Sequence, residues 1–401
     1  MQLLASRLSR IQPSPTLALN ARALELKLQG IDVINLAAGE PDFDTPAWIR
    51  EAATQAMNQG LTKYTAVDGM LSLKQAVQKK FLRDNSLDYA LDEINVSNGG
   101  KQVIFNALFA TLESYNEVII PAPYWVSYPD MVHLCGGISR IVPCGEDVGF
   151  KLTPRALEAA ITPQTKWLIL NSPSNPTGAV YSADELKALA AVLRPHPDIY
   201  VMSDDIYEHL IYDDLSFTNI VQVEPRLKFR TLIVNGVSKA YSMTGWRIGY
   251  GAGPAKLIKA MNLIQSQSTS NACSIAQAAA VMALNGPQDF LADWRQSFQD
   301  RRDMTLDGIN KIEGLTCLRP GGAFYLYVNC AGVLGKTAPD GRPIETDNDF
   351  CGYLLDKAQV TAVSGDAFGL SPYFRISYAI SKEKLTEACA RIEKAVKALV
   401  S

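Results

Sequence analysis

Lys239 and Arg247 are the two residues of this sequence whose types and spacing point most directly to chemistry. Residues 231–234, Thr-Leu-Ile-Val, form an apolar run that predicts a strand buried on both faces, and Lys239 follows shortly after its end. A lysine held in a pocket there loses hydration, its pKa falls, and the free amine can form a Schiff base with an aldehyde. Arg247 carries a permanently charged guanidinium that suits phosphate. The pair therefore predicts binding of a phosphorylated aldehyde, of which pyridoxal phosphate (PLP) is the obvious candidate.

The segment around Lys239 separates this prediction from the alternative that the lysine is an ordinary solvated surface residue. Residues 236–249 read Gly-Val-Ser-Lys-Ala-Tyr-Ser-Met-Thr-Gly-Trp-Arg-Ile-Gly. This segment resembles, position for position, the PLP-lysine signature of class I aminotransferases of fold type I. Matching motifs continue in the same order from about residue 10 to residue 395. Within the family the chain is most similar to bacterial-type aspartate aminotransferases, with aspartate/prephenate and aromatic aminotransferases as close alternatives.

Five further motifs carry the resemblance. They are Ala-Ala-Gly-Glu-Pro-Asp-Phe-Asp-Thr-Pro at 37–46, Asn-Gly-Gly-Lys-Gln at 98–102, Asn-Ser-Pro-Ser-Asn-Pro-Thr-Gly at 171–178, Asp-Asp-Ile-Tyr at 204–207 and Phe-Arg-Ile-Ser at 374–377. The resemblance implies that the catalytic residues are Lys239, Asp204 and Tyr207. It implies cofactor contacts for Lys239, Gly99, Gly100, Lys101, Trp125, Asn175, Asp204, Tyr207, Ser238, Arg247 and Tyr64. It implies substrate contacts for Gly39, Trp125, Asn175, Arg375 and Lys101.

Several of these implied roles have a physical reason. A carboxylate facing a pyridine nitrogen keeps it protonated and makes the ring an electron sink, which is the role implied for Asp204. Its neighbour Asp205 would point the opposite way on an extended chain. Trp125 would stack on the ring, with core packing as the alternative. Arg375 lies among apolar residues, so its buried guanidinium needs a carboxylate, either from a structural ion pair or from a substrate.

The position of Tyr64 implies a partner subunit. In the family a tyrosine at this place reaches the phosphate in the neighbouring subunit, so the resemblance implies a homodimer with shared sites. Half-buried packing is the alternative for an isolated tyrosine. Lys101 is implied to meet the distal carboxylate of a substrate, and the alternative is a surface charge on a helix. Gly39 is implied to touch the substrate, with a simple turn as the alternative.

The amino donor is less determined by the sequence. The polar stretch 265–271 is expected to be a loop, and it lacks the arginine with which some relatives read acidic side chains from the partner. Ser268 or Ser270 is a candidate contact to the phosphate of the neighbouring site. Lys101 favours a dicarboxylic substrate, whereas the missing arginine and the position of Gln12 leave open which residue contacts the distal carboxylate.

Four predicted strands position the site. The strands at 93–97, 166–170, 198–203 and 231–234 lead into Gly100, Asn175, Asp204 and Lys239 respectively. Because the ligands of open parallel sheets bind beyond the carboxyl ends of the strands, these residues should meet at one edge. The predicted class is α/β, a fold type I PLP-transferase with a mostly parallel seven-stranded sheet and a smaller α+β domain.

The chain is expected to divide into three segments. Residues 1–46 would form an N-terminal arm and part of the small domain, 47–300 the large PLP-binding domain and 301–401 the small domain. In the last segment, residues 301–312 predict a long amphipathic helix. The Gly-, Pro-, Thr- and Asp-rich residues 331–347 predict a surface loop able to move over the site.

Composition excludes several other classes. The formal net charge of −3 leaves no basic footprint for nucleic acid or an anionic membrane. The seven cysteines are odd in number and without a Cys-x-x-Cys pair, which indicates reduced thiols in the cytoplasm. The three histidines have no zinc spacing and no clustered carboxylate, so no metal is expected. No run approaches a membrane span, and a resemblance that starts near Arg10 leaves no room for a cleaved leader.

The sequence thus predicts a PLP-dependent aminotransferase that moves an amino group between an L-amino acid, aspartate or glutamate above all, and a 2-keto acid such as 2-oxoglutarate or oxaloacetate. Such a reaction alternates between two half-reactions and has ping-pong kinetics. A PLP lyase or decarboxylase could share every cofactor contact, because the bond that breaks depends on how the substrate is oriented. A PLP-sensing regulator is another alternative, but no DNA-binding module or basic face precedes residue 10. A non-enzymatic scaffold, the last alternative, would not need Lys239, Asp204 and Arg375 together.

Overall fold

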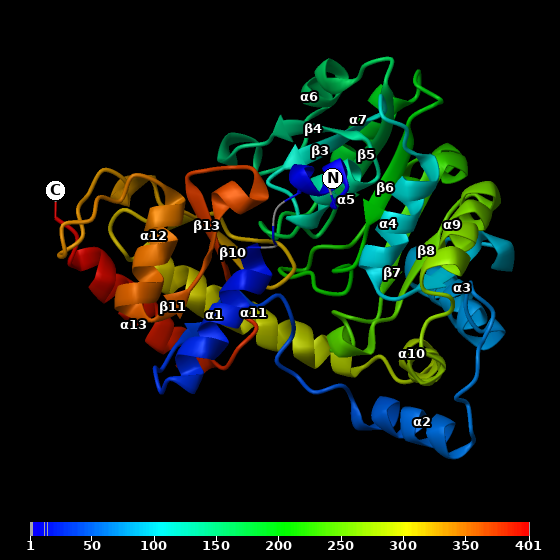
Figure 1. Cartoon of the computed structure of the whole chain (residues 1–401), viewed down its shortest axis with the longest axis horizontal. Helices are drawn as coiled ribbons and strands as arrows, with labels where there is room; N and C mark the ends of the chain where they lie inside the picture. Colours follow the sequence, from blue (N-terminus) through cyan, green and yellow to red (C-terminus); the bar gives the residue numbers. More distant parts are fainter. Residues whose placement is uncertain (1–2, 12, 14, 401) are drawn as a thin grey trace.

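A seven-stranded sheet forms the centre of the larger part of the molecule (Figure 1). The computed structural model describes residues 3–11, 13 and 15–400. The strands lie in the order β2-β8-β7-β6-β5-β3-β4, and β8 alone among them is antiparallel to its neighbours. They are β2 (Ile94–Ser97), β3 (Glu117–Ala122), β4 (Ile138–Pro143), β5 (Thr165–Asn171), β6 (Tyr200–Asp204), β7 (Thr231–Gly236) and β8 (Gly249–Ala252). The predicted α/β class with a mostly parallel sheet is confirmed.

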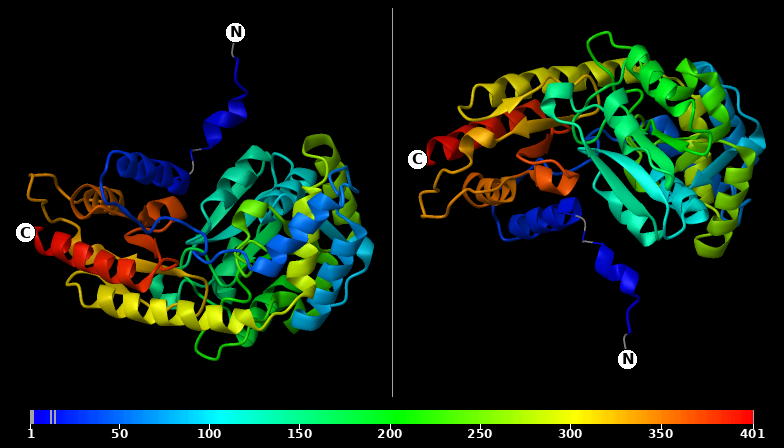
Figure 2. Two further views of the ribbon diagram at one scale, coloured as in Figure 1. Left: turned by 90° about the horizontal axis from the view of Figure 1, so that it is seen from below. Right: turned by 90° about the horizontal axis from the view of Figure 1, so that it is seen from above.

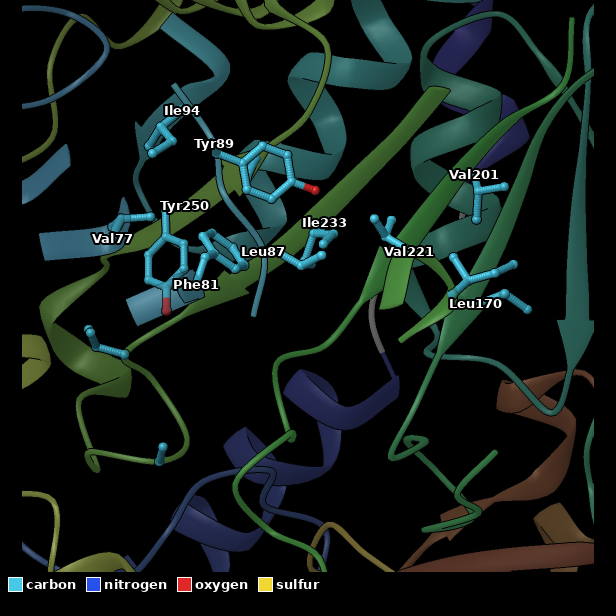
Figure 3. Close-up of a cluster of buried hydrophobic side chains, with 14 of the residues drawn as sticks. Val77, Phe81, Leu87, Tyr89, Ile94, Leu170, Val201, Val221, Ile233 and Tyr250 are labelled. Atoms are coloured by element: carbon cyan, nitrogen blue, oxygen red, sulfur yellow. The ribbon is translucent and has the colours of Figure 1, made fainter. Parts of the chain in front are cut away.

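The central strands are buried on both faces because their sequences are continuous apolar runs. Successive residues of β5 point to opposite sides of the sheet. Leu168 and Leu170 lie in one hydrophobic cluster, whereas Trp167 and Ile169 lie in another. Figure 3 shows part of the first cluster, with Leu170 and Ile233 among its side chains. The sheet is therefore a rigid support for the residues that follow its strands.

Helices cover both faces of this sheet. Helices α4, α5 and α9 contribute to the cluster on one face, and α3, α7, α8 and α10 contribute to the cluster on the other. In the ranges that the structure describes, no helix is both long enough and apolar enough to cross a membrane. The helices of this part are α2 (Ala47–Asn58), α3 (Leu71–Asn85), α4 (Gly100–Thr111), α5 (Ser127–Leu134), α6 (Pro154–Ala160), α7 (Ala183–Leu193), α8 (Ile220–Val223), α9 (Ala255–Ser268) and α10 (Ser274–Asn285).

The smaller part contains an antiparallel four-stranded sheet with the order β12-β13-β10-β9. A parallel pair of β1 and β11 brings the N-terminal segment into this part. The strands are β1 (Ile34–Asn35), β9 (Thr316–Cys317), β10 (Tyr325–Asn329), β11 (Val360–Thr361), β12 (Val363–Ser364) and β13 (Tyr373–Ser377). The helices are α1 (Pro15–Leu28), α11 (Phe290–Asn310), α12 (Asp347–Tyr353) and α13 (Lys382–Lys397). Apart from α1 and β12, these elements contribute to a second hydrophobic core, which also includes Tyr207, Leu210 and Tyr212 of the larger part.

Short helical turns join the longer elements. At the N-terminal end, η1 projects from the body of the molecule (Figure 2). The 3₁₀ turns are η1 (Ser6–Arg10), η2 (Leu91–Glu93), η3 (Glu146–Val148), η4 (Pro225–Arg230), η5 (Thr244–Trp246), η6 (Ala331–Val333) and η8 (Gly365–Phe368), and η7 (Leu354–Ala358) is a π-helix.

One local prediction is wrong, and another, the helix at 301–312, is confirmed with different bounds. The stretch 265–271 is not all loop, because α9 continues to Ser268 and the Gln265 amide is buried, donating to the carbonyls of Val67 and Val96 at 2.6 and 2.8 Å. A buried glutamine is tolerated there because its amide is hydrogen-bonded. The long helix expected at 301–312 already begins at Phe290, so α11 runs without a break across residue 300.

The predicted mobile loop 331–347 is held away from the site. Thr337 and Val400 exchange backbone hydrogen bonds of 2.8 and 2.9 Å, so the loop pairs with the C-terminal end of the chain. Ala338 and Ile344 are buried in the core of the smaller part. The loop therefore does not cover the cavity described next, whose lining contains none of its residues.

Candidate active site

A cavity of about 450 Å³ opens where the carboxyl ends of β2, β5, β6 and β7 face the smaller part. Gly100, Asn175, Asp204 and Lys239, one from the end of each strand, all line it. Their proximity was predicted, because ligands of open parallel sheets bind beyond the carboxyl ends of the strands. The lining includes these of the predicted site residues: Gly39, Gly100, Lys101, Trp125, Asn175, Asp204, Tyr207, Ser238, Lys239, Arg247 and Arg375. Gly99 and Tyr64 lie outside the lining.

Lys239 lies in the cavity, and the pKa of its amine is lowered. Its Nζ donates a hydrogen bond of 2.5 Å to the carbonyl oxygen of Gly39. Burial lowers the pKa of Lys239 to about 8, with Glu40 raising it and Arg375 and Arg247 lowering it. The amine is therefore half uncharged near pH 8, and the uncharged form is the one that a nucleophile or a general base requires.

Asp204 is the last residue of β6 and points into the cavity. Its Oδ2 accepts a hydrogen bond of 2.6 Å from the Tyr128 hydroxyl. Burial raises the pKa of Asp204 to about 6, and the bond from Tyr128 opposes that rise. Asp205 faces away and accepts hydrogen bonds from Ser203 and Asn219 instead. The structure thus brings the first of the two neighbouring aspartates, as predicted, to the cavity.

Arg375 on β13 is 2% exposed and lines the cavity. Its Nη1 donates to Asn175 Oδ1 at 2.8 Å and its Nη2 to the Ala37 carbonyl at 2.7 Å. Within the described residues Nε has no hydrogen-bond partner and the guanidinium forms no ion pair. The alternative that Arg375 is buried because it forms a structural ion pair is therefore not supported within the described residues. Since a buried cation without a counter-ion is costly, the arrangement suits an anionic ligand such as a carboxylate.

One end of the cavity is suited to a phosphate group. Helix α4 starts at Gly100, so its first N–H groups and the positive end of its dipole lie beside the cavity. Gly99 has φ +84°, and a Cβ there would collide with the Arg247 guanidinium. Among the residues that the structure describes, Arg247 donates to the carbonyls of Thr244 and Asn98, at 2.9 and 3.4 Å. Backbone donors, a glycine and a cation held by neutral acceptors fit the phosphate end of PLP.

Lys101 and Trp125 lie together in the cavity. The Lys101 Nζ is 4.9 Å from the centre of the Trp125 ring. Burial lowers the pKa of Lys101, and the nearby Arg247 lowers it further. Lys101 therefore lines the cavity although its side chain is exposed, and its contact with a substrate carboxylate remains a prediction beside the alternative of a surface charge.

The predicted contacts of Tyr64 and of Ser268 or Ser270 are not found at the cavity of a single chain. Tyr64 is 90% exposed and lies outside the cavity. Neither Ser268 nor Ser270 lines it, and the Ser268 hydroxyl donates to the Ile264 carbonyl at 3.0 Å. Gln12 lies outside the described residues.

Two tyrosines of the site were not predicted. Tyr325 lines the cavity, and its hydroxyl oxygen is 2.8 Å from that of Tyr207. Tyr128 holds Asp204, although in the sequence it is only the last residue of an aromatic segment without an assigned role. No spacing or motif around either residue distinguishes it from a core tyrosine.

The expectation that no histidine lies near clustered carboxylates is wrong. His209 Nε2 lies 3.4 Å from Glu208 and 3.7 Å from Asp84. Lys80 forms a buried ion pair with Glu208 and donates to Asn85 Oδ1 at 2.8 Å. The ammonium group of Lys80 already supplies positive charge to this cluster, which is separate from the cavity lining.

Comparison with known proteins identifies the family. The profile described as aminotransferase class I and II matches residues 31–392. The chain is 56% identical to an aspartate aminotransferase of Rhizobium meliloti (strain 1021), covering 98% of this chain and 95% of the relative. It is 58% identical to the aspartate/prephenate aminotransferase of Cereibacter sphaeroides, covering 98% of both chains.

Solved structures agree with this assignment. The crystal structure of the aspartate aminotransferase from Rhizobium meliloti has a TM-score of 0.96, 55% identity and full coverage of both chains. The aspartate aminotransferase from Thermus thermophilus with maleate has a TM-score of 0.92 and 42% identity over 98% of this chain and 100% of that chain. The chain therefore belongs to the class I and II aminotransferases, and it uses pyridoxal 5′-phosphate to transfer an amino group between an amino acid and a 2-keto acid.

Proposed function

We propose that this aminotransferase acts on the dicarboxylic amino acids aspartate and glutamate, with 2-oxoglutarate or oxaloacetate as the amino acceptor. The observation that carries the proposal is a second cation, Lys101, in the cavity that also contains Arg375. A substrate with two carboxylates can place one on each cation. The names of the relatives, aspartate and aspartate/prephenate aminotransferase, support the same choice.

Prephenate or an aromatic amino acid is the second candidate substrate. One relative is named for both aspartate and prephenate. Ile104, one helical turn after Lys101, and Leu17 of α1 add apolar surface to the lining. Such surface suits a ring-bearing substrate, whose carboxylate could still reach Arg375.

We assign the following roles to the residues of the cavity. Bound PLP supplies a cationic ring that withdraws electrons from the Cα of the amino acid. Lys239 holds the cofactor covalently and, when released, takes the Cα proton as a general base. Asp204 keeps a proton on the ring nitrogen. Arg375 binds the α-carboxylate, for which its Nε–H is free of partners among the described residues.

The other predicted residues position the cofactor. When PLP is bound, Asn175 and Tyr207 would donate hydrogen bonds to its phenolic oxygen, and Trp125 would contact its ring. Gly99, Gly100, Ser238 and Arg247 hold its phosphate, with Lys101 on the adjacent side. Gly39, whose carbonyl now accepts from Lys239, contacts the substrate once the lysine has moved.

We further propose a homodimer in which Tyr64 of the partner subunit completes the phosphate site. In a single chain Tyr64 is 90% exposed, and Met57, Leu61 and Leu71 of the same region are exposed apolar side chains. Mixed dimers of Lys239→Ala and Tyr64→Ala test this sharing. One site of such a dimer carries both changes and the other carries neither, so activity should return on mixing. No recovery, despite exchange of subunits, would rule out the shared site.

The division into an arm with part of the small domain (1–46), a large domain (47–300) and a small domain (301–401) remains our proposal. The unbroken α11 would act as the rigid connection between the last two. We also place the protein in the cytoplasm, where its seven free cysteines would stay reduced.

The visible absorbance of the purified holoenzyme tests the substrate proposal. Aspartate or glutamate should bleach the cofactor band, and 2-oxoglutarate should restore it. Bleaching by aromatic or neutral amino acids alone would refute the dicarboxylic preference and favour the second candidate. Lys239→Ala should keep the cofactor bound but lose turnover by at least about 10²–10⁴-fold. The matched control Lys256→Ala, at an exposed lysine of α9, should behave as the unmodified protein.

A further inference from the structure

Tyr325, the first residue of β10, connects three groups of the site that come from distant parts of the chain. Its side chain is 0% exposed, and its hydroxyl oxygen lies 2.8 Å from that of Tyr207. The centre of its ring is 4.4 Å from the guanidinium carbon of Arg375. A Cβ on Gly39 would lie 3.0 Å from its hydroxyl. Tyr325 therefore has a fixed position between the smaller part and the catalytic groups of the larger part.

The hydrogen bond between the two phenols can have either polarity. Burial raises the pKa of both Tyr207 and Tyr325 above the usual range, so both hydroxyls keep their protons at neutral pH. Each phenol has one proton to donate and can also accept. If Tyr325 donates, the proton of Tyr207 remains available to a further acceptor in the cavity. If Tyr207 donates, its only proton is used within the pair.

The charges around the pair favour donation by Tyr325. The Arg375 guanidinium lies over the Tyr325 ring, and a cation at that place makes the phenol a better donor. The Asp204 carboxylate acts on Tyr207 in the opposite direction and makes its oxygen a better acceptor.

Three influences oppose this polarity: Arg375 also lowers the pKa of Tyr207, the Lys239 ammonium lies 5.9 Å from the centre of the Tyr207 ring, and Glu40 raises the pKa of Tyr325. The Arg375 guanidinium, 4.4 Å from the centre of the Tyr325 ring, is closer than the Lys239 ammonium is to Tyr207, and it favours donation by Tyr325.

We propose that Tyr325 is a positioning residue that donates its hydroxyl proton to Tyr207 and so directs the Tyr207 proton toward the phenolic oxygen of bound PLP. This inference rests on the role given to Tyr207 under the proposed function. Hydrogen bonds in a chain polarise one another, so Tyr207 becomes a stronger donor when Tyr325 donates to it. A stronger donor makes the cofactor oxygen less basic. The ionisation that changes the colour of the bound cofactor then has its midpoint at a lower pH.

The test is a pH titration of the visible absorbance of the holoenzyme. Tyr325→Phe keeps the ring under Arg375 but removes the donor, so the midpoint should rise by roughly 0.4–1 pH unit, the equivalent of one hydrogen bond. Tyr207→Phe should also raise the midpoint, and by more than Tyr325→Phe does. When Tyr207 is already phenylalanine, adding Tyr325→Phe should shift the midpoint by no more than ~0.1 unit.

Other outcomes overturn the inference. A midpoint that falls in Tyr325→Phe means that Tyr207 donates to Tyr325 in the unmodified protein. An unchanged midpoint in Tyr325→Phe means that the Tyr325 hydroxyl does not affect the cofactor and that the residue only packs. If Tyr325→Phe still shifts the midpoint when Tyr207 is phenylalanine, Tyr325 does not act through Tyr207. Tyr353→Phe is the matched control, because Tyr353 is also buried in the smaller part but donates to Ala395, away from the cavity. Absence of any visible band in the unmodified holoenzyme would instead refute the proposed function.

Discussion

Arg375 of the smaller part donates a hydrogen bond of 2.8 Å to the side-chain oxygen of Asn175 in the larger part. The two residues lie on β13 and in the loop after β5, and 200 positions of the sequence separate them. A second bond to the Ala37 carbonyl holds the other terminal nitrogen of the guanidinium. The guanidinium to which we assign carboxylate binding is therefore held in place without a substrate, and its position depends on how the two parts meet.

Replacing Asn175 by aspartate should block the carboxylate site. Asn175→Asp has nearly the same shape, but it places a negative charge at 2.8 Å from Arg375 Nη1, where it competes with the substrate. We expect the KM for aspartate and for 2-oxoglutarate to rise on the order of 10–100-fold. Asn175→Ala removes the contact without adding charge and should raise KM less. Equal KM values in the two variants would contradict a competing charge.

The pKa of Lys239 should govern how fast the apoprotein reacts with PLP. Because the uncharged amine is the nucleophile, the rate should rise with pH and be half-maximal near pH 8. Arg375→Gln removes a cation that lowers this pKa and should move the midpoint to higher pH. Glu40→Gln removes an anion that raises it and should move the midpoint to lower pH. Stopped-flow absorbance measures these rates, and shifts of the same sign in both variants would refute the electrostatic explanation.

The buried carboxylate of Asp204 should contribute less to the stability of the apoprotein at neutral pH than at low pH. Burial raises its folded-state pKa from 3.8 to about 6, so the folded state binds more protons than the unfolded state between these values. Stability from this group is therefore lost as pH rises from about 4 to about 6. Asp204→Asn should stabilise the apoprotein at pH 7 by about 3 kcal/mol and by almost nothing at pH 4.

Urea unfolding of the two apoproteins at several pH values measures this difference. The same substitution should weaken turnover of the holoenzyme, because an amide cannot hold the positive charge of the ring nitrogen. A stabilisation that does not change between pH 4 and pH 7 would show that the ionisation of Asp204 is not its cause.

Replacing Lys101 tests substrate choice. Lys101→Met keeps a long unbranched side chain but removes the cation that lies 4.9 Å from the centre of the Trp125 ring. We expect kcat/KM for aspartate to fall on the order of 10–100-fold, while kcat/KM for phenylalanine stays within about threefold. Lys256→Met is the matched surface control. Equal losses for aspartate and phenylalanine would assign Lys101 to the cofactor phosphate instead of the distal carboxylate.

Much of the fold and of the site could be predicted from the sequence because both depend on local patterns. Continuous apolar runs such as residues 231–234 indicate strands that are buried on both faces, and β7 contains them. Once several parallel strands are recognised, their carboxyl ends must share one edge. Lys239, Asp204 and Asn175 could therefore be expected together, and the structure places all three in one cavity.

Only the tertiary structure decided which further groups complete the site. Tyr207 and Tyr325 are 118 positions apart, and neither sequence neighbourhood contains a signal of the other. Gln265 looks like a loop residue until the backbone of Val67 and Val96 supplies its partners. The loop 331–347 is held by Val400 at the far end of the chain.

The physical reason for this division is the range of the interactions. Helix and strand periodicity reflects contacts between near neighbours in the sequence, and such contacts leave a repeating pattern of apolar residues. A hydrogen bond between distant segments leaves no such pattern, because it depends on how whole elements pack. The sequence by itself therefore determined the strands and the residues at their ends, whereas the packing of the two parts decided the partners of Arg375, Asp204 and Tyr207.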